Sequence, residues 1–299
     1  MAKDTFFYKK RTIRCNSRII ELDKPLVMGI LNLTPDSFYD GGKYTTPKSL
    51  HRHLDQMITD GADIIDVGGY SSRPGAADVP QNIELERIEP ALEFIRTRYP
   101  DAIISIDTFR AGVASALIEK YKVDLINDIT AGIIEPEILD VVAENQVAYI
   151  AMHMQGTPQN MQQAPHYEHI VTDIIDFFSN RLAVLQQKKI NDIVIDPGFG
   201  FGKTLDQNYQ LLAGLDNFRI FEFPVLAGLS RKSMIYKQLG SGPEDALAGT
   251  IALNTIALQM GTSILRVHDV KEAKHTIDIC EKLKAESEKS INLLTSLKR

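Results

Sequence analysis

The chain has 299 residues, of which 44% are hydrophobic and 24% charged, and its formal net charge at pH 7 is −6. This length suits one large barrel domain or two ordinary domains. The negative charge balance argues against a general nucleic-acid surface, because binding to a phosphate backbone needs concentrated positive charge. There is no signal-peptide-like run, no stretch of about 18 apolar residues, and only two distant cysteines, Cys15 and Cys280. The composition therefore predicts a soluble, cytoplasmic protein that binds neither nucleic acid nor membrane.

Short, near-continuous apolar runs alternate along the chain with longer amphipathic stretches. The runs that predict strands buried on both faces are Leu26–Leu31, Asp63–Gly68, Ile103–Ile106, Asp124–Ile126, Val147–Met152, Ile193–Ile195, Val225–Gly228 and Ile264–Val267. The stretches that predict helices are Pro47–Asp60, Ile83–Arg98, Gly112–Lys120, Pro136–Glu144, Tyr167–Lys188, Leu205–Leu212, a split pair within Lys232–Met260, and Val270–Lys284. This alternation is typical of parallel βα units.

The number of units decides the fold class. A doubly wound sheet is an alternative, but eight βα units within about 260 residues favour a single α/β domain of the (β/α)8 TIM-barrel type. No composition shift marks a second domain. We predict a short strand-rich N-terminal extension over residues 1–24, the barrel over 25–285 and a charged C-terminal tail over 286–299.

Polar or charged residues follow nearly every predicted strand. These residues are Asn32, Ser72, Arg73, Asp107, Asn127, His153, Asp196, Lys232, Arg266 and His268. The carboxyl ends of the strands of a parallel barrel converge on one rim, where such barrels hold their active sites. The pattern therefore predicts one polar pocket at this rim.

The types of these side chains indicate the chemistry of the ligand. Carboxylates such as Asp107 and Asp196 are costly at buried strand ends unless they accept hydrogen bonds from a planar donor edge, as a guanidine-like heterocycle offers. Asn127 supplies both a donor and an acceptor for a mixed ring edge. The cationic side chains that suit a diphosphate are Arg73, Arg266 and His268. Taken singly, a strand-end Asp is about as often a helix cap, and a lone His is more often structural.

Two loops that follow the first two barrel strands are rich in glycine, proline and polar residues. They span residues 32–42 and 68–75, and their composition suits flexible lids that close over a substrate, although ordinary surface loops are the alternative. A third glycine-rich stretch, Asp196–Thr204, lacks the Walker A pattern because Pro197 stands where a glycine is needed, and it lacks the Gly-x-Gly-x-x-Gly spacing. It predicts neither an ATP nor an NAD site.

The sequence contains no strong motif for a protein-bound metal ion or for a catalytic nucleophile. No His-x-x-x-His, Cys-x-x-Cys or clustered carboxylate triad suggests a dedicated metal cage, and no Gly-x-Ser-x-Gly elbow occurs. A Mg²⁺ ion carried mainly by substrate phosphates and touched by the oxygen of Asn32 is compatible with the sequence.

Several segments together resemble the dihydropteroate synthase family of pterin-binding enzymes. They are Met28–Phe38, Ser71–Gly75, Ser105–Thr108, Ile126–Asp128, Met152–Pro158, Asp196–Lys203, Ser230–Ser233 and Arg266–Asp269. The resemblance implies that 6-hydroxymethyl-7,8-dihydropterin diphosphate condenses with 4-aminobenzoate to 7,8-dihydropteroate, by dissociative loss of diphosphate followed by attack of the arylamine. It also implies a Mg²⁺ cofactor, inhibition by sulfonamides and a homodimer.

The resemblance also implies a role for individual residues. The expected pterin contacts are Asp107, Asn127, Met152, Asp196 and Lys232. The expected diphosphate contacts are Asn32, Ser72, Arg73, Arg266 and His268, with Asn32 also reaching the Mg²⁺. The expected 4-aminobenzoate contacts are Phe38, Pro74, Phe201 and Ser233. The candidate catalytic residues are Asp36, which would stabilise developing positive charge, Arg73 and Lys232.

The second loop departs from the pattern of many bacterial members, in which Glu stands at the position of Tyr70 and Thr at that of Ser72. Ser72 keeps the hydroxyl and loses a methyl, which puts the fit of the arylamine pocket in doubt. Two other functions stay open. A pterin-binding methyltransferase domain would not need the Ser-Arg-Pro-Gly loop, and a non-catalytic pterin-binding paralogue would not need Arg73 or Lys232.

Overall fold

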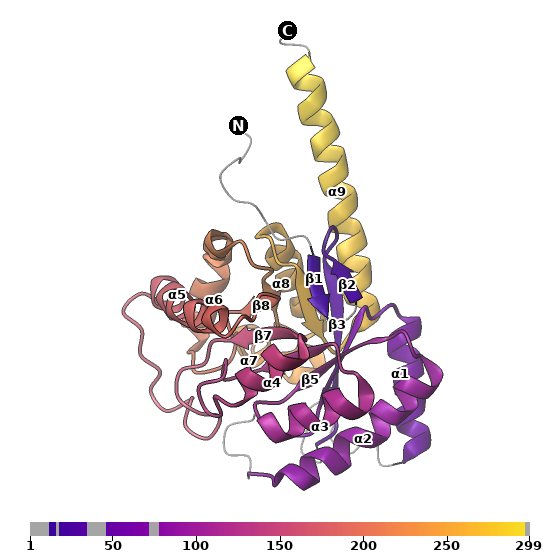
Figure 1. Cartoon of the computed structure of the whole chain (residues 1–299). Helices are drawn as coiled ribbons and strands as arrows, with labels where there is room; N and C mark the ends of the chain where they lie inside the picture. Colours follow the sequence, from indigo (N-terminus) through magenta and orange to yellow (C-terminus); the bar gives the residue numbers. More distant parts are fainter. Residues whose placement is uncertain (1–11, 16–17, 35–45, 72–77, 297–299) are drawn as a thin grey trace.

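Eight parallel strands form the centre of the molecule (Figure 1). The computed structural model describes residues 12–15, 18–34, 46–71 and 78–296, with side chains to residue 290. The barrel strands are β3 (Leu26–Asn32), β4 (Ile64–Gly68), β5 (Ile103–Asp107), β6 (Leu125–Asp128), β7 (Ala148–Met152), β8 (Ile193–Asp196), β9 (Leu226–Ala227) and β10 (Ile264–Val267). Their order is β8-β7-β6-β5-β4-β3-β10-β9. Ile195 N donates to Pro224 O at 2.9 Å, and this contact closes the sheet into the predicted TIM barrel.

Helices connect successive strands and cover the outside of the barrel (Figure 1). They are α1 (Pro47–Thr59), α2 (Gln81–Arg98), α3 (Ala111–Tyr121), α4 (Ile138–Asn145), α5 (Ile170–Gln187), α6 (Leu205–Ala213), α7 (Ser233–Leu239), α8 (Leu247–Gln259) and α9 (Val270–Ser296), with short 3₁₀ helices η1 (Leu215–Phe221) and η2 (Pro243–Asp245). The predicted helices are confirmed, with ends that differ by a few residues. The largest difference is α9, which continues without a break from residue 284 to 296.

Local sequence signals fix where the first helix begins and ends. The Thr46 side chain accepts a hydrogen bond from Ser49 N, and Pro47 occupies the first turn, where its missing N–H costs nothing. Gly61 follows the helix with a φ of +95°, a conformation that side chains other than glycine rarely adopt. The chain then turns directly into β4.

A hairpin closes the amino-terminal end of the barrel. Its strands are β1 (Thr12–Cys15) and β2 (Arg18–Glu21), which pair antiparallel. The hairpin lies across one end of the barrel (Figure 1), and its apolar side chains are buried against the inward-facing side chains at the start of the barrel strands. The hairpin residues in this cluster are Ile13, Cys15 and Ile20, together with Leu22. The hairpin therefore covers one end of the barrel, and the opposite rim is available for a site.

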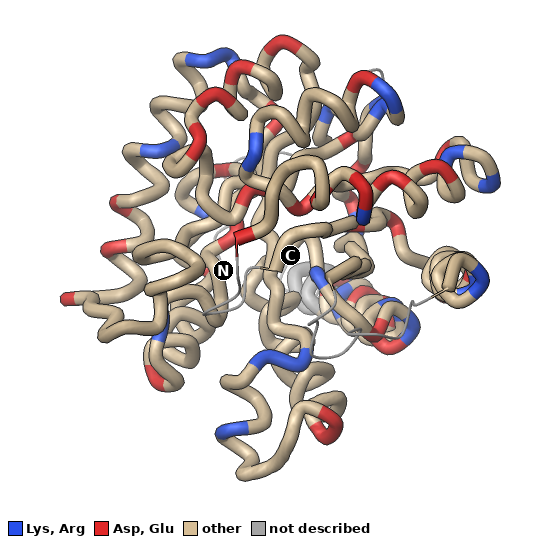
Figure 2. The backbone as a smooth tube through the Cα atoms, turned by 90° about the horizontal axis from the view of Figure 1, so that it is seen from below, with Lys and Arg blue, Asp and Glu red and all other residues tan. Residues whose placement is uncertain are grey.

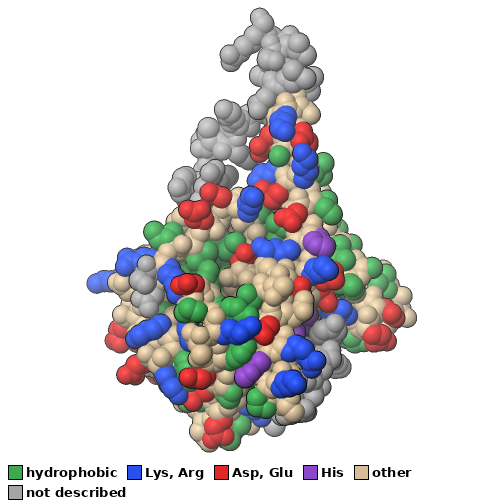
Figure 3. All heavy atoms as spheres, turned by 90° about the vertical axis from the view of Figure 1, so that its right-hand side faces the viewer, with side chains coloured by type: hydrophobic (Ala, Val, Ile, Leu, Met, Phe, Trp, Pro, Cys, Tyr) green, Lys and Arg blue, Asp and Glu red, His purple; other side chains and the backbone are tan. Residues whose placement is uncertain are grey.

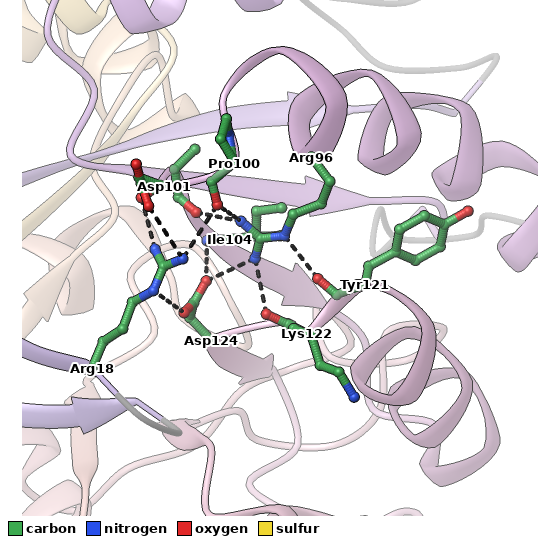
Figure 4. A network of polar contacts seen from close by, with 9 residues as sticks. Arg18, Arg96, Pro100, Asp101, Ile104, Tyr121, Lys122 and Asp124 are labelled. Carbon is green, nitrogen blue, oxygen red and sulfur yellow. Dashed lines mark hydrogen bonds and ion pairs between the residues drawn. The ribbon is translucent and has the colours of Figure 1, made fainter.

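Arg96 and Asp124 tie the hairpin end of the barrel together (Figure 4). Asp124 accepts from Arg96 Nη2 and from Ile104 N, both at 3.0 Å. Arg96 also donates to backbone carbonyls of neighbouring connections, including Tyr121 O at 2.7 Å. Arg18 of the hairpin donates to the Asp101 carbonyl at 2.7 Å and lies 4.0 Å from Asp124. These contacts satisfy polar groups at the closed end, away from the rim.

The last helix projects beyond the barrel (Figures 1 and 3). Its described surface carries Lys and Glu side chains in alternation, and three ion pairs link them, for example Lys282 with Glu286 at 2.6 Å. Such pairs stabilise an exposed helix by a few tenths of a kcal/mol each, roughly 0.3–0.5. Across the part of the chain that the structure describes, no helix combines the length and apolar character needed to span a membrane.

Inward-facing residues change from apolar to polar along several of the barrel strands. Because side chains alternate across a strand, Ile64 is followed inside the barrel by Asp66, Leu125 by Asn127, and Ile264 by Arg266. The apolar members face the hairpin, and the polar members lie toward the opposite rim. Figure 2 views that side, where Lys and Arg alternate with Asp and Glu over the surrounding helices. The inward-facing polar side chains of the barrel therefore lie near the rim opposite the hairpin.

Candidate active site

One arginine joins two carboxylates inside the barrel. Arg266 donates from Nε to Asp66 Oδ2 at 2.6 Å and from Nη2 to Asp107 Oδ2 at 2.6 Å. Asn127 Nδ2 donates to the same Asp66 oxygen at 3.0 Å. Burial raises the pKa of Asp107 above its ordinary value, although Arg266 opposes this effect. Burial acts to lower the pKa of Arg266. The nearby carboxylates of Asp66 and Asp107 have the larger combined effect, so the pKa of Arg266 is raised.

Asp196 ends β8 and is held by the glycine-rich loop that follows it. Its Oδ1 accepts from Gly198 N at 2.8 Å, and the side chain is buried. Gly198 has a φ of +74°, and a Cβ there would lie 1.9 Å from the His153 carbonyl oxygen. Only glycine fits this backbone. Burial raises the pKa of Asp196, and the charge of Lys232 acts in the opposite direction.

Lys232 approaches the same loop from the connection between β9 and α7. Its Nζ donates to the Phe199 carbonyl and lies 4.9 Å from the centroid of the Phe201 ring. Burial lowers the pKa of Lys232 to about 8, against the effect of Asp196. An ammonium over an aromatic face is attracted to the ring, so Phe201 and Lys232 fix one another at the rim.

A second buried lysine, Lys203, holds the glycine-rich loop from beneath. Its Nζ lies 2.8 Å from Gly198 O, 3.0 Å from Phe201 O and 3.1 Å from His153 Nδ1. Burial lowers the pKa of both Lys203 and His153 well below their ordinary values. The His153 ring also packs edge-on against Phe177 at 4.8 Å. His153, one of the polar residues at the strand ends, therefore faces the loop rather than a ligand.

A cavity of about 270 Å³ opens beside this cluster. The polar residues that line it include Asn32, Ser230, Lys232, Ser233, Arg266 and His268. Ser230 Oγ lies 3.1 Å from His268 Nδ1, which orients the imidazole. Three of the predicted diphosphate contacts, Asn32, Arg266 and His268, thus share one cavity with Lys232 and with Ser233, a predicted 4-aminobenzoate contact.

An apolar cluster adjoins the polar one at the rim. Met152, Phe109 and Ile129 are buried together, with Tyr70, Met154 and Phe201 packed against them. The cluster brings Met152, a predicted pterin contact, next to Phe201, a predicted 4-aminobenzoate contact. A flat ring would find an apolar face here and polar edges at Asp196 and Asn127, which is the usual arrangement of a small-molecule site.

Five of the predicted site residues lie outside the described residues. They are Asp36, Phe38, Ser72, Arg73 and Pro74. Within the described ranges, no group of three or more His, Cys, Asp or Glu side chains is arranged to hold a metal ion. Asn32 lines the cavity, and its side chain carries an amide oxygen of the kind that would suit a Mg²⁺ ion whose other ligands come from substrate phosphates.

Sequence reasoning missed three polar residues of this region. Asp66 lies in the middle of an apolar run, Lys203 closes the glycine-rich loop, and Ser230 supports His268. The signal for Asp66 was present in the alternation of β4, which places residue 66 on the inward face together with Gly68. Lys203 and Ser230 carry no such periodic signal.

Comparisons with known proteins agree with this geometry. The model of the family described as "Pterin binding enzyme" matches residues 28–268. The dihydropteroate synthase of Escherichia coli K12 is 44% identical over 266 residues, covering 88% of this chain and 93% of that protein. The dihydropteroate synthase of Haemophilus influenzae is 42% identical over 257 residues, covering 85% and 92%.

Solved structures give the same result. A sulfonamide drug complex of Yersinia pestis dihydropteroate synthase has a TM-score of 0.87 and 41% identity, covering 92% of this chain and 99% of that one. The Xanthomonas albilineans dihydropteroate synthase in complex with 7,8-dihydropteroate has a TM-score of 0.81 and 37% identity, with the same coverage. A structure of that enzyme with 4-aminobenzoic acid has a TM-score of 0.84 and 39% identity, covering 93% and 99%.

Proposed function

Because this chain belongs to the dihydropteroate synthase family of pterin-binding enzymes, we propose that it condenses 6-hydroxymethyl-7,8-dihydropterin diphosphate with 4-aminobenzoate. The products are 7,8-dihydropteroate, a folate precursor, and diphosphate. The proposal rests on one observation: a group of residues that suits a pterin and a cavity that suits a diphosphate lie next to each other at one rim. Buried carboxylate and amide groups that suit a pterin edge lie next to a cavity lined by Arg266 and His268.

The pterin is recognised by polar groups held in fixed positions. Asp196 accepts hydrogen bonds from the amino-pyrimidinone edge, and its second oxygen is oriented because the first is bound to Gly198 N. Asp107 and Asn127 meet the opposite edge of the ring, and Met152 packs against its face. Lys232 reaches the ring carbonyl from the side of Phe201.

The diphosphate occupies the adjoining cavity. Arg266 and His268, which line the cavity, neutralise its oxygens. Ser72 and Arg73, which lie outside the described residues, add the contacts that the family resemblance implies. Asn32 would hold a Mg²⁺ ion together with the phosphate oxygens, and such an ion would supply positive charge that offsets the charge of the departing diphosphate. Chelation of the metal with EDTA is therefore expected to stop turnover, and added Mg²⁺ is expected to restore it.

The reaction exchanges one bond for another at the exocyclic methylene carbon. Its bond to the diphosphate oxygen breaks with both electrons leaving on the oxygen, and the carbon then bonds to the arylamine nitrogen, which loses a proton. The residues stabilise charge and hold the two substrates in line, so no protein nucleophile is required. Phe201, Ser233, Phe38 and Pro74 hold the 4-aminobenzoate. Asp36 offsets the developing positive charge.

Product formation by the purified protein tests this proposal. Wild type supplied with both substrates and Mg²⁺ should release dihydropteroate and diphosphate in equal amounts, while Arg73→Ala should release little of either. Pterin binding without turnover would instead indicate a non-catalytic paralogue. Sulfonamides should compete with 4-aminobenzoate, and a homodimer is expected in solution.

A further inference from the structure

We infer that Asp66 is a positioning residue that fixes Arg266 and Asn127 in the geometry the pterin diphosphate requires. This inference rests on the proposed function. Asp66 lies in the middle of β4 and is fully buried, so it is out of reach of substrate. Its Oδ2 accepts from Arg266 Nε at 2.6 Å and from Asn127 Nδ2 at 3.0 Å. One carboxylate oxygen therefore couples a proposed diphosphate contact to a proposed pterin contact.

Asp66 determines which way the amide of Asn127 points. An ionised carboxylate only accepts hydrogen bonds, so Asn127 must turn its NH₂ group toward Asp66. The carbonyl oxygen of Asn127 is then presented toward the ring site, where it accepts from a pterin N–H. Asp66→Asn would satisfy either orientation of that amide, and the preference would be lost.

Asp66 and Asp107 both form ion pairs with Arg266, but they differ in how exposed they are. Both accept from its guanidinium at 2.6 Å, but the Asp107 side chain ends its strand and is 18% exposed, whereas that of Asp66 is fully buried. Asp107 is thus able to exchange Arg266 for a pterin N–H. Asp66 keeps its bond and holds the guanidinium toward the cavity.

The placement of Asp66 on a central strand makes it suited to this task. β4 pairs with β3 and β5, with Asp66 in register with Ile30 and Ser105. A short side chain on a strand paired on both edges has little freedom, so its oxygen is a fixed reference point. Its other oxygen, Oδ1, is buried and makes no hydrogen bond within the described residues. All of the polar contacts of Asp66 in that part of the chain therefore pass through the oxygen shared by Arg266 and Asn127.

Steady-state kinetics of Asp66→Asn test the inference. This variant conserves shape, and Arg266 keeps its bond to Asp107. We expect the KM for pterin diphosphate to rise at least ~10-fold, because a charge-assisted buried bond is lost, while the KM for 4-aminobenzoate stays within about 2-fold. Calorimetric binding of pterin diphosphate should weaken by the same factor. Asp128→Asn is the matched control, since Asp128 is equally buried but bonds to Thr130, Gly132 and Tyr149.

Removing both partners of Asp66 separates positioning from general stability. If Asp66 acts through Arg266 and Asn127, adding Asp66→Asn to a variant that carries both Arg266→Ala and Asn127→Ala should raise the KM for pterin diphosphate by less than about 2-fold further. A full additional increase, or an unchanged pterin KM in the folded single variant, would overturn the inference. If Asp66→Asn does not fold, Asp66→Ser carries the same measurements, and failure of both to fold beside a folded Asp128→Asn would assign Asp66 a purely structural role. Absence of product from wild type would overturn the proposed function instead.

Discussion

Gly198→Ala perturbs the site through the backbone alone. Its φ of +74° costs an alanine about 1–2 kcal/mol. In addition, the new Cβ would lie 1.9 Å from the His153 carbonyl oxygen, which is backbone and has no rotamer to change. Overpacking of this kind costs about 1–3 kcal/mol more. The loop must therefore shift, and Gly198 N moves away from Asp196 Oδ1.

Gly240→Ala is the matched control, because Gly240 also has a positive φ, +64°, but no atom lies within 4 Å of a Cβ there. Thermal unfolding should place Gly198→Ala roughly 2–5 °C below Gly240→Ala, because each kcal/mol lowers the melting temperature of a chain of 299 residues by about 1.6 °C. Gly198→Ala should also raise the KM for pterin diphosphate, whereas Gly240→Ala should not. Equal melting temperatures and an unchanged pterin KM would refute the reasoning that this glycine is required to hold Asp196.

Burial lowers the pKa of Lys232 to about 8, so turnover that needs its charge should decline above about pH 8. The unfolded chain holds that proton up to about pH 10, so the free energy of unfolding should rise with pH between about pH 8 and pH 10, and Lys232→Met should remove this rise in melting profiles. Arg231 makes two 2.8 Å bonds to Asp269, and Arg231→Lys should lower the unfolding free energy by about 1–3 kcal/mol in urea titrations, since lysine lacks the paired donors. Ser72→Thr should alter sulfonamide inhibition constants, and unaltered constants would contradict a role of this position in the arylamine pocket.

The fold was predictable because its signals are local. The barrel strands are near-continuous apolar runs, and some helices begin or end with a recognisable residue, as Thr46 and Gly61 show for α1. The last turns of α9 carry a weaker signal. Between residues 285 and 290 most side chains are exposed, so no apolar stripe marks the helix there, and ion pairs between successive turns are its local support.

The rim positions of several strand-end residues were predictable, but the hydrogen bonds that join them were not. The strand-end positions of Asp107, Asn127 and Asp196 indicated one rim, and the structure brings them there. The partner of Asp66 lies 200 residues away at Arg266, a pairing that depends on how the barrel closes. The sequence likewise gave no sign that His153 turns toward Lys203, because that contact follows from the shape of the glycine-rich loop.

Calorimetric binding of pterin diphosphate to wild type and Asp196→Asn tests the central claim most directly. The account predicts one site per chain, and a loss of roughly 10- to 100-fold in affinity on removing this buried charged acceptor. Asp192→Asn is the control, because Asp192 lies before β8 at the hairpin end, where it accepts from Arg14 N at 2.9 Å. Equal affinities for wild type and Asp196→Asn, or no binding to wild type, would contradict the assignment of the barrel rim as a pterin site.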